Sequence, residues 1–211
     1  MTAILKVDTI QDTSGNNIIN ESSDTITIGA SGDTTNIVGT LQNNGSALNF
    51  ATVNGITEYD MFRLTSDTQG PFTLTSNLER VDTSFEKIGT GMSQSSGVFT
   101  FPSTGKYEVR FTATGKNPDA TGERNYVANI QLTTNNSSYS NVASSSNNIG
   151  YYGSSVNNWQ TTSAFVFLDI TDTSNMKVKF NVETNGNSNT YTMSSSASNI
   201  TYMTFIKFGD T

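Results

Sequence analysis

From about residue 56 onward, apolar and polar residues alternate along the chain with a period of two. In the stretch 105–113 every second position is apolar, and charged or small polar residues stand between them. The stretches 126–132 and 176–182 repeat this pattern, and turns rich in Asn, Gly and Ser separate the three. Alternation of this kind predicts β-strands with one buried face, and no longer window has the period of a helix. The region is therefore predicted to be an all-β sandwich or jelly roll.

Two stretches break the alternation: 164–168 is apolar on both faces, and 202–208 is nearly so. In a small antiparallel sandwich only one face of a strand meets the core, so an apolar outer face needs another partner. We favour a second subunit as that partner. The alternative is a central strand that a loop of the same chain covers. The aromatic residues predicted to lie between subunits are Phe165, Phe167, Tyr202, Phe205 and Phe208.

Residues 1 to about 55 are sparse in apolar side chains and contain no Pro or Tyr. Four apolar residues recur there at a spacing of ten: Ile18, Ile28, Val38 and Leu48. One short strand per repeat cannot bury a core alone, but three identical chains wound together can bury a thin apolar line along their axis. We therefore predict a thin stalk, β-structured or extended, at residues 1–55 and a head domain at 56–211. The alternative for the first region is a flexible linker with a chance periodicity.

The composition disfavours several classes of site. The chain has no Cys and no His, so disulfides, thiolate metal sites and the commonest general base are excluded. The formal net charge is -7 and the bases are scattered singly, which disfavours nucleic-acid binding. No segment approaches the roughly 20 apolar residues of a membrane span, and the N-terminus has no apolar signal core, so neither membrane insertion nor export is expected. No cofactor and no metal site is predicted.

Asp169 and Asp172 come nearest to a catalytic carboxylate pair on a structured element. Two carboxylates at a suitable separation can hydrolyse glycosides. These two flank a predicted turn, however, where Asp commonly forms local hydrogen bonds. The chain also lacks a phosphate loop, a dinucleotide fingerprint and a nucleophile motif. We therefore interpret both residues as turn residues and predict that the protein is not an enzyme.

The stretch Gly97 to Val109 resembles the G-x-F-x-x-P-x-x-G-x-Y-x-F segment of complement globular-head domains, which belong to the tumour necrosis factor-like jelly rolls. The stretch 201–210 is similar to the last core strand of that family, and 165–182 looks like the hairpin before it. The usual Gly-Asp turn of that hairpin is replaced here by residues 172–175. Over residues 59 to 210 the resemblance implies ten short strands in two sheets and a compact homotrimer. It implies no particular ligand, because a fold does not fix a function.

The N-terminal segment 4–16 is similar to the openings of structural fibre proteins of tailed phages. That resemblance implies attachment to another virion protein through this end. The apolar residues predicted to form the anchor are Ile4, Leu5, Val7 and Ile10.

The segment 135–159 is rich in Ser, Asn and Gly and carries several aromatic residues. Binding loops favour this mixture, since rigid aromatic rings supply contact area and small polar residues adapt their hydrogen bonds. Tyr151, Tyr152 and Trp159 are therefore predicted to contact a receptor, either a glycan or a protein of the host surface. The alternative is that these rings cap the end of the sandwich or fill the seam between subunits.

The expected protein is a structural, non-enzymatic component of a bacteriophage virion, assembled in the host cytoplasm and released by lysis. Within the virion it would be a homotrimeric tail fibre, anchored by its N-terminus, with a jelly-roll head that serves host attachment. Three heads on one fibre would give avidity to a weak single contact. The alternative is a capsid decoration protein or head fibre without a dedicated receptor.

Overall fold

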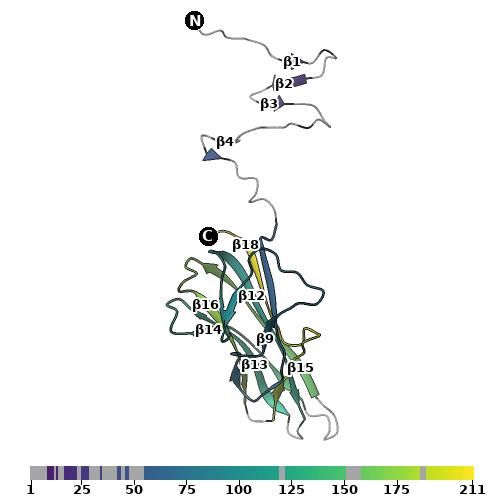
Figure 1. Cartoon of the computed structure of the whole chain (residues 1–211), viewed down its shortest axis with the longest axis vertical. Helices are drawn as coiled ribbons and strands as arrows, with labels where there is room; N and C mark the ends of the chain where they lie inside the picture. Colours follow the sequence, from purple (N-terminus) through teal and green to yellow (C-terminus); the bar gives the residue numbers. More distant parts are fainter. Residues whose placement is uncertain are drawn as a thin grey trace. The chain divides into compact units, whose positions relative to one another are not determined.

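A computed structural model of the chain divides into two compact units, residues 1–53 and 54–211 (Figure 1). In the N-terminal unit the structure describes residues 9–11, 13, 17–22, 25–28, 34, 42–43 and 46–47. In the C-terminal unit it describes 55–118, 122–150, 158–185 and 189–211. None of the described residues is helical, so none of them forms a helix long and apolar enough to cross a membrane.

The described part of the N-terminal unit consists of short antiparallel strands. They are β1 (Thr9–Gln11), β2 (Asn17–Ser22), β3 (Thr25–Ile28), β4 (Gln42–Asn43) and β5 (Ser46–Ala47). The first three form one sheet with β2 in the middle, and the last two form a hairpin. Of the four apolar residues spaced by ten, Ile18 lies in β2 and Ile28 ends β3, whereas Val38 and Leu48 lie outside the described residues. The side chain of Ile28 is exposed in the single chain.

The C-terminal unit is a sandwich of two antiparallel sheets. The sheet that we call the β12 sheet contains β6 (Glu58–Leu64), β7 (Thr68–Gln69), β9 (Leu78–Arg80), β12 (Gly105–Asn117), β15 (Asn158–Ile170), β17 (Tyr191–Thr192) and β18 (Tyr202–Gly209). The β13 sheet contains β8 (Phe72–Thr73), β10 (Ser93–Ser95), β11 (Val98–Thr100), β13 (Glu123–Thr133), β14 (Ser140–Ile149) and β16 (Lys177–Thr184). The long strands lie in the orders β15-β12-β18-β6 and β16-β13-β14, and the short β11 pairs with β16.

The all-β jelly-roll prediction is confirmed. The described residues of this unit form thirteen strands instead of ten, because several strands of two or three residues pair along the edges of the long ones. The predicted alternation holds in β12, where Tyr107, Val109 and Phe111 are fully buried while Lys106 is exposed. Each sheet therefore presents one apolar face to the other, and the sequence pattern follows directly from that geometry.

Four Phe rings from both sheets form the centre of the core. Phe99 is fully buried, and its ring centroid lies 5.1 Å from that of Phe62, 5.3 Å from that of Phe180 and 5.2 Å from that of Phe205. These separations fall in the range in which aromatic pairs add to the energy of apolar burial. The cluster joins β11, β16, β6 and β18, so it holds the two sheets together at one point.

The turn between β10 and β11 depends on Gly97. Its φ is +77°, and a Cβ at this position would collide with the backbone carbonyl of Leu74. We expect Gly97→Ala to lower the free energy of unfolding by at least about 3 kcal/mol, because backbone strain and a clash add together. Urea denaturation of the purified chain measures the loss.

Gly70 provides the matched control for this prediction. Its φ is +74°, but nothing lies within 4 Å of where its Cβ would stand. Gly70→Ala should therefore cost only the conformational strain, about 1 kcal/mol. Equal losses in the two variants would show that the contact with Leu74 does not matter.

Candidate interaction surface

Three Phe side chains lie exposed on the outer face of the β12 sheet. Phe165 and Phe167 of β15 are 53% and 64% exposed, and Phe208 of β18 is 57% exposed. They face outward because alternate residues of a strand point to opposite sides of the sheet, and the inner face of β15 already supplies Ala164 and Leu168 to the core. We call these three residues the aromatic patch.

The rings of the aromatic patch contact one another, and one of them contacts Arg110 of the neighbouring strand β12. The centroids of Phe165 and Phe167 lie 6.4 Å apart, and those of Phe167 and Phe208 lie 5.8 Å apart. The guanidinium carbon of Arg110 lies 5.0 Å from the centroid of Phe165, and Arg110 also pairs with Glu108 at 3.0 Å. In the β12–β15 register Arg110 is opposite Phe165 and Glu108 is opposite Phe167. The three rings are therefore fixed by contacts with one another and with Arg110.

A hollow of about 370 Å³ opens beside the aromatic patch. Phe167 and Phe208 form its apolar walls together with Leu168, while Lys106 and Asp169 lie at its polar side. The ammonium of Lys106 and the carboxylate of Asp169 are 3.9 Å apart, and both side chains are more than half exposed. A rigid apolar surface with a hollow and a charged rim has the anatomy of a protein–protein interface.

The structure separates the five predicted interface residues into two groups. The register places Tyr202 on the same outer face as the aromatic patch, where it is half-buried. Phe205 is fully buried in the core instead, so the prediction that it lies between subunits is wrong. The physical reason is the period of two: Tyr202 and Phe208 share one face of β18, and Phe205, at an odd separation from both, must point to the other.

Trp159 is the one predicted receptor residue that lies among the described residues. It is 51% exposed on β15, opposite Lys116, and it has the same outward direction as Phe165 and Phe167. Tyr151 and Tyr152 lie outside the described residues, as do Ile4, Leu5 and Val7 of the predicted virion anchor. Ile10, the fourth anchor residue, belongs to β1 and is 39% exposed.

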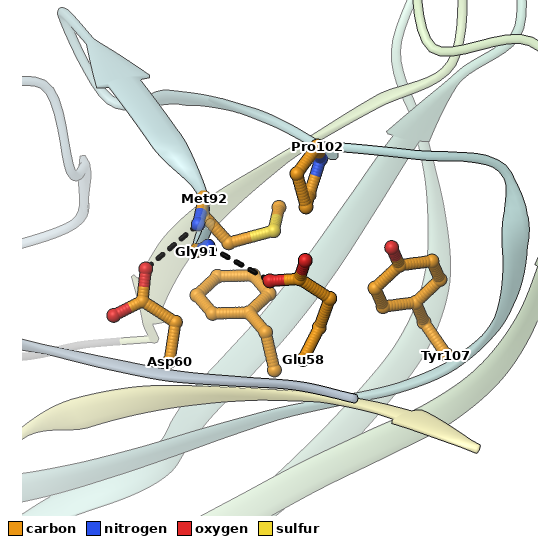
Figure 2. Close-up of a pocket in the computed structure, with 7 residues that line it drawn as sticks. Glu58, Asp60, Gly91, Met92, Pro102 and Tyr107 are labelled. Carbon is orange, nitrogen blue, oxygen red and sulfur yellow. Dashed lines mark hydrogen bonds between the residues drawn. The ribbon is translucent and has the colours of Figure 1, made fainter. Parts of the chain in front are cut away.

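Glu58 and Asp60 form a pair of carboxylates on β6 that was not among the predicted site residues. Figure 2 shows both on one side of the strand, with Glu58 accepting a hydrogen bond from the N–H of Gly91 and Asp60 one from the N–H of Met92. These bonds are 2.8 Å and 2.7 Å long, and Asp60 also forms an ion pair with Arg80 at 2.9 Å. Side chains fill the space between these residues and leave no room for a ligand. The pair therefore fixes the loop before β10, and the spacing of two between the carboxylates was the signal available in the sequence.

Asp172 serves local structure, as expected of a residue at a turn. The carboxylate of Asp172 accepts hydrogen bonds from the side-chain amide of Asn175 and from the backbone N–H of Ser174. These hydrogen bonds hold the pKa of the Asp172 carboxyl below its ordinary value, and the bond from the Asn175 side chain has the largest effect. Asp169 faces Lys106 instead. Within the described ranges, no three residues of the types His, Cys, Asp and Glu are grouped as a metal site would require.

Comparison with known proteins identifies the fold. No protein-family model and no curated protein sequence matches the chain. Among solved structures, murine APRIL at pH 8.5 matches with a TM-score of 0.51 and 9% sequence identity, over 72% of this chain and 98% of that one. Eiger TNF from S. frugiperda matches with a TM-score of 0.50 and 9% identity, over 75% of this chain and 96% of that one. At this identity the likeness establishes a tumour necrosis factor-like jelly roll and nothing further about function.

Proposed function

We propose that the chain is a structural protein of a tailed-phage virion, a homotrimeric tail fibre that is anchored by its N-terminus and presents a jelly-roll head to the host surface. The observation that carries this proposal is the aromatic patch on a sheet whose other face already forms the core. Support for the phage context comes from the likeness of residues 4–16 to the openings of phage fibre proteins.

The aromatic patch favours association of identical chains. Three Phe side chains, each more than half exposed and in mutual contact, form an apolar surface of a kind that is uncommon on monomeric proteins. Buried aromatic anchors with an adjacent Arg are typical of the residues that dominate binding energy at interfaces. A closed ring of copies buries this surface in every subunit at once.

The proposed function is binding and not catalysis. The carboxylates of Glu58 and Asp60, and likewise those of Asp169 and Asp172, are bound to backbone N–H groups or to basic side chains. A glycosidase instead needs an acid and a base on either side of a cleft wide enough for substrate. The apolar patch, by contrast, matches an assembly role without further assumptions.

Cryo-electron microscopy of virions that contain this chain tests the proposal. The expected density is a trimer of heads that extends from the tail, with residues 4–10 in contact with another virion protein. The purified chain alone should have the mass of three subunits of 22.7 kDa. Trimers on capsid vertices or facets would contradict the fibre proposal and favour a decoration protein. A monomeric chain at every concentration would contradict the proposed assembly itself.

A further inference from the structure

A second hollow, of about 310 Å³, lies on the outer side of the β13 sheet, and we call it the polar hollow. Most of the residues that line it are polar, whereas the aromatic patch consists of three Phe residues. Ser93, Ser95, Thr100, Gln94, Asn136, Lys177 and Val98 line it, so hydroxyl, amide and ammonium groups are present in its lining together with apolar atoms. None of these residues is acidic, although the chain as a whole carries a net charge of -7.

The walls of the polar hollow are fixed by local hydrogen bonds. On one side the β10–β11 hairpin closes through a tight turn in which Ser96 and Gly97 have φ values of 48° and 77°. On the other side the turn before β14 is held by the side-chain oxygen of Asn135, which accepts a bond of 2.8 Å from the N–H of Ser138. The backbone N–H of Asn136 donates to the carbonyl of Asn175 at 3.0 Å. A site with such walls binds without first having to order its own loops.

Lys177 is the cation among the residues that line the polar hollow. It begins β16, is half-buried, and pairs in register with Thr100 of β11 and Thr133 of β13. Among the described residues its ammonium has no ion pair and no hydrogen bond to a side chain, whereas the next outward cation, Lys179, lies 4.0 Å from the ring of Tyr139. The nearby carboxylate of Asp172 is bound within its own turn. Lys177 is thus available to an external anion.

We propose that the polar hollow binds an acidic sugar, with the sugar carboxylate at the ammonium of Lys177 and the ring hydroxyls at the surrounding hydroxyl and amide groups. Hydroxyl and amide side chains both donate and accept, which suits a ligand that is itself covered with hydroxyl groups. A single ammonium matches a single carboxylate, whereas phosphate recognition favours Arg forks or several cations. The volume lies at the lower end of the range of small-molecule sites, as expected for one sugar unit.

The polar hollow and the aromatic patch lie on opposite sheets of the sandwich, so association through the patch leaves the hollow open. A trimer would then carry three copies of the site, and a polymeric glycan could engage them together. The assignment of the sugar to the host surface rests on the proposed function. Binding of an acidic sugar in the polar hollow does not depend on that function.

Saturation-transfer NMR with the purified full-length chain tests the inference, with methyl β-glucuronide and the methyl glycoside of N-acetylneuraminic acid as probes. At least one of the two should bind at millimolar concentration, and methyl β-glucoside, which has a hydroxymethyl group in place of the carboxylate, should bind at least about tenfold more weakly. Lys177→Gln should weaken binding of the acidic probe by about tenfold and leave that of the glucoside unchanged.

Two further variants separate the site from general effects of charge and folding. Arg124→Gln removes an exposed cation of β13 that does not line the hollow, and it should leave the affinity unchanged. Asn136→Gly keeps the positive φ of 53° at that position and removes only the amide, so it should weaken both acidic and neutral sugars. Absence of binding by both acidic probes, or equal losses in Lys177→Gln and Arg124→Gln, would overturn the inference. Capsid placement of the trimers would instead overturn the fibre proposal and leave a positive binding result intact.

Discussion

Replacing Phe165 and Phe167 together with Asp is expected to convert the assembled protein into folded monomers. Both side chains are more than half exposed in the single chain, so the substitution removes nothing from the core of the subunit. In the proposed trimer the same two rings are desolvated, and truncation of such anchors commonly costs at least about 2 kcal/mol each. Two buried carboxylates at every subunit contact would weaken association further, because a buried unpaired charge is costly. Light scattering after size-exclusion chromatography should then give the mass of one chain.

The control for this experiment is Val142→Asp. Val142 is an exposed apolar residue of β14, on the other sheet, and 36% of its side chain is accessible. The substitution adds one carboxylate, as each of the two Phe replacements does, without touching the aromatic patch, so the variant should stay trimeric. Far-ultraviolet circular dichroism should show the same strand content in both variants and in the unmodified chain. A Phe165/Phe167 variant that remains trimeric would place the subunit interface elsewhere.

Phe99→Ala is expected to lower the free energy of unfolding by about 3–5 kcal/mol, the usual cost of deleting a fully buried Phe. Its side chain has 0% exposure and contacts three other rings that come from both sheets. The deletion therefore leaves a cavity at the point where the two sheets are joined, and the neighbouring strands can close it only in part. Urea denaturation at one fixed protein concentration measures the loss, since association also contributes to apparent stability.

Ile56→Ala serves as the control for the core prediction. Ile56 lies just before β6 and is 44% exposed, so its truncation should change the free energy of unfolding by no more than about 0.5 kcal/mol. If Phe99→Ala cost no more than Ile56→Ala, the four-ring cluster would not be the centre of the core. Measuring both in the monomeric Phe165/Phe167 background would show that the loss belongs to the subunit itself.

Much of the head follows from the local pattern of residues. Because successive side chains of a strand point to opposite faces, the alternation in 105–113 assigns Tyr107 and Val109 to the core without any knowledge of neighbouring strands. The same rule explains why Phe165 and Phe167, which share one face, are both exposed once Ala164 and Leu168 fill the other. An apolar residue on each face of one strand was sufficient to indicate an external partner.

The wrong assignment of Phe205 shows where the pattern is weakest. In the stretch 202–208 nearly every residue is apolar, so hydrophobicity does not distinguish the two faces. Only the pairing of Phe205 with Val109 of β12, whose own inward direction is clear, settles which face is buried. Counting by two from Phe208 would have given the same answer, because residues an odd number apart cannot share a face.

The sequence by itself determined the fold class, the strands with one apolar face and the presence of surplus aromatic residues on β15, because each of these depends on a period that is visible within a few residues. The tertiary structure alone decided which distant segments meet. It brought Glu58 and Asp60 to the loop that contains Gly91 and Met92, and it brought Lys177 to the hairpin that carries Ser93 and Thr100. Such meetings depend on which strands pair across the sandwich, and that is a property of the whole chain's packing that no local period encodes.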